Sequence, residues 1–139
     1  MDKWLRFEHA GKTGFGKLQG DTITVYQGDM FSNPAATSQT LALSAVRLLT
    51  PTQPTKMLAI LNNFHALAAK LNAAIPQEPL YLIKTSNSFL AGGETIRWPK
   101  SFGGKVFYEG ELGIVIGKTC KAVSEAEAPS HIFGYTCIN

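Results

Sequence analysis

The sequence predicts an α+β protein that is predominantly β, with a small N-terminal β-meander domain over residues 1–55 and a second, β-rich domain over residues 56–139. Three observations favour this class. Alternating apolar residues and glycine-containing turns fill the first 26 residues, a proline-punctuated connector follows at residues 50–55, and β-branched apolar runs outnumber helical patterns beyond it. At 139 residues, the chain is large enough for one core, and it could also divide into two modules.

The N-terminal domain is predicted to hold three short strands, 4–8, 15–18 and 22–26, joined by turns. A sheet this small buries too little apolar surface alone, so it must pack on something else. His9 falls in the first turn, where we expect a surface side chain without chemistry. Residues 31–44 are rich in Ser, Thr, Asn and Pro, which predicts a loop with one helical turn.

The boundary between the two domains lies in a connector with two prolines. Residues 46–49 form a short apolar strand, and the prolines of residues 50–55 oppose a helix there. Residues 56–61 are continuously apolar after the first lysine, which predicts a buried strand covered on both faces. The second domain is therefore expected to begin at residue 56.

Two candidate site residues follow this buried strand. His65 precedes a run of strong helix formers, residues 66–74, which Pro76 ends. An imidazole at such a junction can face a cleft and transfer protons, or it can be a polar helix-start residue that makes one hydrogen bond. Lys84 ends the next apolar strand, 79–84, where it can hold an anionic substrate or reach solvent.

The run 105–117 is apolar and β-branched except for two carboxylates. Glu109 and Glu111 are two residues apart, so in a strand they point to the same face. Like charges placed there repel each other unless something positive lies between them. Their hard oxygen atoms suit Mg²⁺, Mn²⁺ or Ca²⁺, and the alternative is a solvated strand face with two glutamates.

The last part of the chain reads as a helix start and a strand. Ser124 and Glu127 are spaced as a capping box, so Glu125 and Glu127 are interpreted as partners of a helix N-terminus rather than as metal ligands. Residues 132–139 form the final predicted strand.

Composition excludes several classes of partner. The net charge is +3 and the basic residues are scattered, which favours neither nucleic acid nor an anionic membrane. No apolar run reaches the roughly 18 residues that span a bilayer. Two cysteines without metal-type spacing, and no signal peptide at the first residues, predict a cytoplasmic protein.

The order of these motifs resembles the fumarylacetoacetate hydrolase family. The resemblance rests on Asn62-Asn63-Phe64-His65-Ala66, on Tyr81-Leu82-Ile83-Lys84, on the strand from Tyr108 to Gly117 and on Phe133-Gly134-Tyr135-Thr136-Cys137-Ile138-Asn139. It spans residues 56–139, and the first domain is similar to the small leading domain of bacterial members.

The resemblance implies a mixed β-roll with peripheral helices, usually in a homodimer, and a bound Mg²⁺ or similar cation. It makes Glu109 and Glu111 the first two metal ligands and places a third, an aspartate, directly after Asn139. His65 matches a histidine that transfers protons together with a glutamate three residues later, a position that is Ala68 in this chain. Lys84 matches a lysine that faces the substrate.

The family acts on β-dicarbonyl or 2-oxo acid substrates, as in the catabolism of aromatic compounds. The implied activity is that of a carbon–carbon hydrolase, a 2-hydroxyhepta-2,4-diene-1,7-dioate isomerase or an oxaloacetate decarboxylase, with a metal-stabilised enolate common to all three. The family's catalytic domain is longer than residues 56–139, so we expect a fragment of a longer enzyme. The alternative is a non-catalytic structural or interaction module that keeps the fold.

Overall fold

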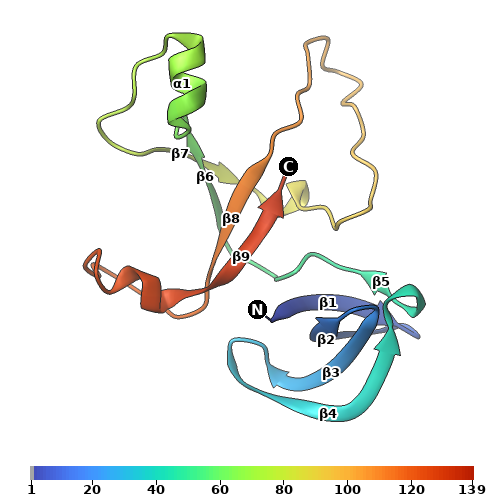
Figure 1. Ribbon diagram of the computed structural model, residues 1–139. Coiled ribbons are helices and arrows are strands. Elements are labelled where there is room, and N and C mark those ends of the chain that lie inside the picture. Colours follow the sequence, from blue (N-terminus) through green and yellow to red (C-terminus); the bar gives the residue numbers. More distant parts are fainter. Residues whose placement is uncertain (1) are drawn as a thin grey trace. The chain divides into compact units, whose positions relative to one another are not determined.

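The computed structural model describes residues 2–139 and divides into two compact units (Figure 1). One unit contains the residues up to Pro51 together with Ala91–Asn139, and the other is Thr52–Leu90. Most regular structure is antiparallel β-sheet, which confirms the predicted fold class. The predicted domain boundary after residue 55 stays a prediction. No helix within residues 2–139 has the length and apolar character needed to cross a bilayer.

The first unit begins with a five-stranded antiparallel sheet in the order β4-β3-β2-β1-β5. Its strands are β1 Lys3–His9, β2 Lys12–Gln19, β3 Thr22–Asp29, β4 Ser32–Ala42 and β5 Arg47–Leu48. The three predicted strands are confirmed within this larger sheet. His9 closes β1 as a half-buried residue instead of lying in the turn, so that prediction was wrong.

Strand β4 replaces most of the loop predicted over residues 31–44. It is an edge strand whose pairing with β3 shifts register twice, and a 3₁₀ turn, η1 Leu43–Ala45, follows it. Asn33 has a φ of 54° and Pro34 cannot donate a hydrogen bond, and both features are tolerated at a sheet edge. The polar composition of this segment therefore reflects an edge strand rather than a loop.

Aromatic and aliphatic side chains form the core of this sheet. Phe7, Ile23 and Met30 are almost fully buried. Trp4 packs edge-on against Tyr26 with ring centroids 4.8 Å apart, and the Lys17 ammonium lies 4.8 Å from the Trp4 ring centroid. The sheet thus has the packed face that a small meander alone would lack.

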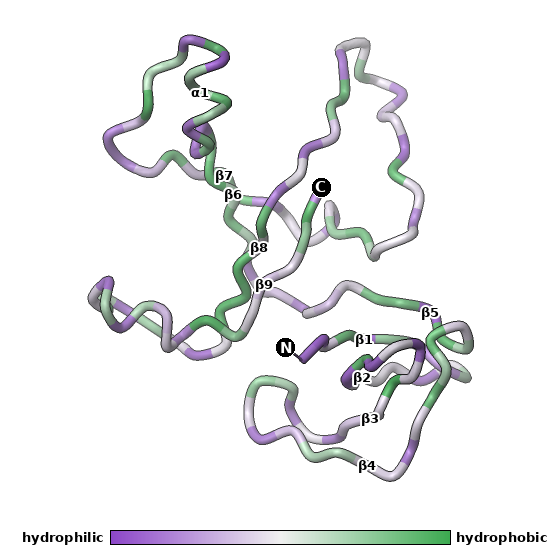
Figure 2. The backbone as a smooth tube through the Cα atoms, in the orientation of Figure 1, coloured by the Kyte–Doolittle hydropathy of each residue, from purple (hydrophilic) through white to green (hydrophobic). Residues whose placement is uncertain are grey.

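The second part of this unit is a hairpin of β8 Glu111–Ile116 and β9 Ile132–Ile138. The strand predicted over 105–117 was too long, because residues 105–110 are irregular and β8 begins at Glu111. Glu111 lies opposite Ile138 in this ladder. Figure 2 shows the apolar character of β8.

Phe133 connects this hairpin to the five-stranded sheet. Its ring centroid lies 4.7 Å from that of Phe31 and 6.3 Å from that of Trp4. Gly117 lies so close to Phe133 that a Cβ added at Gly117 would be 2.7 Å from the Cβ of Phe133. The hairpin is therefore held by aromatic packing within this unit.

The capping box in the hairpin loop is confirmed. The Ser124 hydroxyl donates to Glu127 Oε2 at 2.7 Å, and the Glu127 amide donates to Ser124 Oγ at 3.3 Å. The predicted helix is only a turn that continues as a 3₁₀ helix, η3 Ala128–His131. Pro129 has no amide hydrogen, so an α-helix cannot propagate through it without losing a hydrogen bond.

The second unit contains β6 Met57–Leu61, α1 His65–Leu71, β7 Leu80–Lys84 and a 3₁₀ turn, η2 Ser86–Ser88. The two strands pair antiparallel. The prediction that residues 56–61 are covered on both faces was wrong, since Leu58 is 56% and Ile60 50% exposed. Two strands and one short helix do not supply two covering layers. Ala68 is the buried residue of α1, and Asn72 ends the helix in the left-handed conformation.

Candidate functional site

The two predicted metal ligands lie at one end of the β8–β9 ladder. Glu111 is the first residue of β8 and is half-buried. Glu109 is exposed and outside the strand, so strand alternation does not place it on the face of Glu111. Its backbone amide instead donates to Asn139 Oδ1 at 2.8 Å, directly after the end of β9. A side-chain hydrogen bond therefore keeps Glu109 beside this end of the ladder.

Glu111 lies on the more covered face of the hairpin. Gly113 and Val115 share that face, whereas Leu112, Ile114 and Ile116 point to the exposed one. An added Cβ at Gly113 would lie 2.6 Å from Ile138 Cδ1 and 2.9 Å from Thr136 Cγ2. The absence of a side chain at Gly113 thus lets the cross-strand side chains pack next to Glu111.

This end of the hairpin offers hard oxygen donors. Neither carboxylate has an ion-pair partner within residues 2–139, so both are available to a cation. Carboxylate oxygens are the ligands that Mg²⁺, Mn²⁺ and Ca²⁺ prefer. No three His, Cys, Asp or Glu side chains of the described chain gather closely enough to hold a metal. The donor chemistry of these two carboxylates suits a divalent cation, and their role as its ligands stays a prediction.

His65 belongs to the second unit, where it is the first residue of α1 and exposed. It lines a hollow of about 180 Å³ whose walls also include Asn62, Asn63, Gln77 and Glu78. Asn62 has a φ of 54°, a left-handed conformation that Asn adopts more readily than most residues, and the chain leaves β6 through it. His65 thus begins the helix and also lines a hollow, and its role in proton transfer stays a prediction.

Lys84 lies at the far end of the same two-stranded sheet. It is the last residue of β7, is exposed, and pairs with Met57, whereas Leu61 and Leu80 pair at the end next to His65. Four residue steps along a strand correspond to roughly 13 Å. Within the second unit, the structure therefore places His65 and Lys84 at opposite ends of the ladder.

Sequence reasoning missed two polar residues next to the predicted site residues. Asn139 was interpreted as the end of a strand and of a family motif, without a side-chain contact, although its side-chain oxygen accepts a hydrogen bond from the amide of Glu109. Glu78 was not singled out, although it lines the hollow of His65. Its position directly before Pro79 and the strand β7 was the available signal, because residues at strand ends meet at one edge of a sheet.

Comparison with known proteins identifies both parts of the chain. Residues 56–139 match the family model described as fumarylacetoacetate (FAA) hydrolase C-terminal, and residues 2–51 match the model described as Rv2993c-like, N-terminal. An oxaloacetate tautomerase of Bacillus subtilis is 33% identical over 102 residues, which are 70% of this chain and 34% of that protein.

Solved structures of two isomerases are also similar. A 2-hydroxyhepta-2,4-diene-1,7-dioate isomerase from Mycobacterium marinum has a TM-score of 0.82 at 29% identity, covering 99% of this chain and 53% of its own. A 5-carboxymethyl-2-hydroxymuconate delta-isomerase from Mycobacterium smegmatis has a TM-score of 0.82 at 32% identity, with the same coverage. The chain spans about half the length of these solved structures and about a third of the Bacillus relative.

Proposed function

The chain belongs to the fumarylacetoacetate hydrolase family, and on that premise we propose that it serves a metal-assisted isomerisation of a 2-oxo acid, in which enol and keto forms interconvert. The observation that carries the proposal is the pair Glu109 and Glu111 at one end of the β8–β9 ladder, with Asn139 bonded to the first. The similarity to a tautomerase and two isomerases supports this reaction type.

Glu109 and Glu111 are proposed as ligands of a divalent cation, Mg²⁺ or alternatively Mn²⁺ or Ca²⁺. When bound, the cation supplies positive charge that stabilises negative charge on the 2-oxo oxygen of the substrate. The chain leaves Asn139 beside Glu109, so a residue that follows Asn139 in a longer protein would emerge at the same end of the ladder. An aspartate there would complete a set of three carboxylates.

His65 is proposed to move the protons of the reaction. Conversion of an enol to its keto form removes the proton from the enol oxygen and adds one to the neighbouring carbon, and no other bond to hydrogen changes. A neutral imidazole can accept the first proton and an imidazolium can donate the second. Lys84, which is exposed at the end of β7, is proposed to pair with a substrate carboxylate.

Isomerisation is preferred over carbon–carbon hydrolysis because it needs no activated water. The similar proteins named above are a tautomerase and two isomerases, which supports a reaction of this type. Hydrolysis would need a base that holds and deprotonates water, whereas isomerisation needs only proton transfer to and from the substrate. Decarboxylation of a β-keto acid is compatible with the same residues and is the alternative outcome of the assay below.

The test uses the full-length protein with Mg²⁺ and the enol form of oxaloacetate. We expect its conversion to the keto form, followed by ultraviolet absorbance, to be accelerated and to require the metal. Glu109→Gln and Glu111→Gln should each weaken Mg²⁺ binding in calorimetry, and Glu125→Gln, an exposed acid elsewhere in the chain, should not. Unchanged Mg²⁺ affinity in both of the first two variants would refute the metal assignment, and release of CO₂ would assign a decarboxylase.

A non-catalytic module is the second candidate. It is favoured by the finding that residues 2–139 gather no set of three metal-binding side chains. In that case calorimetry of the full-length protein should show no saturable Mg²⁺ or Mn²⁺ binding, and the enol of oxaloacetate should convert at the uncatalysed rate.

A further inference from the structure

The hollow beside His65 contains the only acid of its unit. Residues 52–90 contain one histidine, His65, and one acidic residue, Glu78. Both line the same hollow of about 180 Å³. A carboxylate that served only solubility could lie anywhere on the surface of this unit. The position of Glu78 at the same hollow as the only histidine of the unit therefore indicates a chemical role.

The ladder brings these two residues to the same edge. Leu61 is the last residue of β6 and pairs with Leu80, the first residue of β7. His65 follows Leu61 by four positions and Glu78 precedes Leu80 by two. Both residues therefore lie next to the same end of the strand pair. Pro79 restricts the backbone of Glu78, which lowers the backbone entropy lost when this residue is held at the hollow.

An imidazole that transfers protons works best when a carboxylate fixes its tautomer and stabilises its charged form. The helix cannot supply this carboxylate, because α1 contains only His, Ala, Leu and Lys and its residue 68 is a buried alanine. Building on the proposed function, we propose that Glu78 is the positioning residue of His65, so that the proton-transfer pair is formed by residues thirteen positions apart and not within the helix.

The test is a double-mutant cycle on enol-to-keto conversion by the full-length protein with Mg²⁺. Glu78→Gln keeps the shape of the side chain and removes its charge. We expect this variant to lower kcat roughly 10²-fold with KM changed less than about twofold, and Glu78→Asp to recover most of the loss. In the double variant His65→Ala with Glu78→Gln, kcat should equal that of His65→Ala alone, because a positioning residue has no effect once its partner is gone.

The outcomes separate the two proposals. A wild-type protein without enol-to-keto activity would overturn the proposed function and the role of Glu78 with it. An active wild type together with a fully active Glu78→Gln variant would overturn only the role of Glu78. Additive losses in the double variant would do the same, since they would show that Glu78 acts independently of His65. Glu125→Gln serves as the matched control and should retain wild-type kcat.

Discussion

At the scale of single residues, Asn139 has the clearest consequence for the proposed metal site. Its side-chain oxygen accepts the hydrogen bond from the Glu109 amide at 2.8 Å. Asn139→Ala should therefore let Glu109 leave the end of the hairpin and weaken Mg²⁺ binding about tenfold, as expected when a group that orients a ligand is removed. Calorimetry on the full-length protein measures this, with Asn87→Ala as the matched control. Equal Mg²⁺ affinity of Asn139→Ala and wild type would contradict the positioning role.

The capping box predicts a pH effect at one carboxylate. Hydrogen bonds from the Ser124 hydroxyl and amide favour the charged form and lower the pKa of Glu127 below its ordinary value. This contribution to stability is present above the unfolded-state pKa and is lost as pH falls through the lowered folded-state pKa.

The substitution that tests this effect is Ser124→Ala. It should raise the pKa of Glu127 toward the ordinary value, which NMR titration of the Glu127 side chain would show. Glu125 neighbours the same turn, and its titration in the two proteins provides the internal control. A Glu127 pKa that is equally low in both proteins would rule out the box as its cause.

At the scale of elements, the approach of β2 to β3 depends on a residue without a side chain. A Cβ added at Gly16 would lie 2.2 Å from the backbone oxygen of Thr24. Gly16→Ala should therefore force the strands apart and lower the free energy of unfolding by about 2 kcal/mol. Gly110→Ala, where an added Cβ meets nothing within 4 Å, should leave it within about 0.5 kcal/mol. Chemical denaturation gives both values, and equal stability of the two variants would contradict the steric argument.

The elements that sequence reasoning found are those with a periodic apolar pattern. Alternation located β1, β2 and β3, and the approximate positions of β6, β7 and β9 followed from apolar runs. Strand β4 was missed because an edge strand does not need buried side chains on alternate positions. The length of β8 was overestimated because the apolar pattern of residues 105–117 does not show which of them pair with another strand.

The residues of the candidate site could be predicted from the sequence, whereas the contacts between them could not. Residue types and order indicated Glu109, Glu111, His65 and Lys84. The hydrogen bond between Glu109 and Asn139, and the hollow that includes His65 and Glu78, are contacts between residues distant in sequence. Local patterns alone do not determine which distant residues meet, so the neighbours of each predicted residue were identified only in the structure.

At the scale of the whole chain, exposed apolar side chains predict self-association. Leu112, Ile114 and Tyr135 are each more than half exposed on one face of the β8–β9 hairpin. Burying such surface is favourable by about 25 cal/mol per Å². The 139-residue chain should therefore associate reversibly or aggregate, and we propose that the full-length protein is a homodimer.

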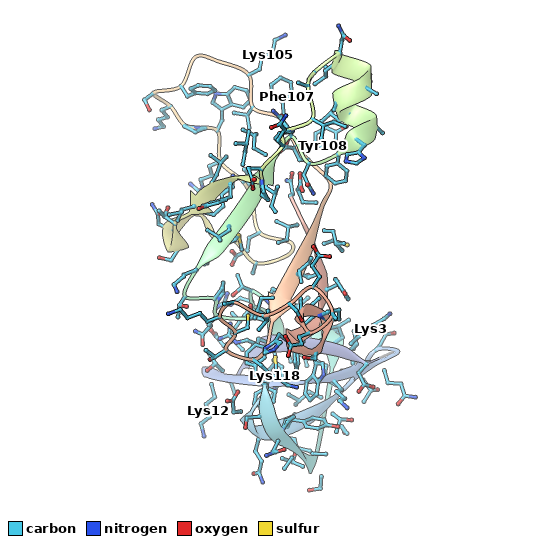
Figure 3. The ribbon with its side chains drawn as sticks, turned by 90° about the vertical axis from the view of Figure 1, so that its left-hand side faces the viewer. Lys3, Lys12, Lys105, Phe107, Tyr108 and Lys118 are labelled. Atoms are coloured by element: carbon cyan, nitrogen blue, oxygen red, sulfur yellow. The ribbon has the colours of Figure 1, made fainter. Side chains whose placement is uncertain are left out.

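Sedimentation velocity over a range of concentrations tests this expectation. Replacing Leu112 and Ile114 with threonine, which retains strand propensity and lowers hydrophobicity, should shift the 139-residue chain toward monomer. Lys105, Phe107 and Tyr108 lie in the irregular segment before β8, where Figure 3 marks them, and Phe107→Ser would serve as a control at an exposed site outside the sheet face. A wild-type chain that sediments as a compact monomer at all concentrations would show that the exposed face of the β8–β9 hairpin does not associate.

The packing of Phe133 on Phe31 and Trp4 has a thermodynamic consequence for the pair of glutamates. A two-stranded hairpin is marginally stable alone in water. The packing of Phe133 against the five-stranded sheet therefore stabilises β8 and β9. Melting of the N-terminal sheet should then release the hairpin in the same transition. A change in the fluorescence of Trp4 on melting would thus also report the loss of the structure that positions Glu109 and Glu111.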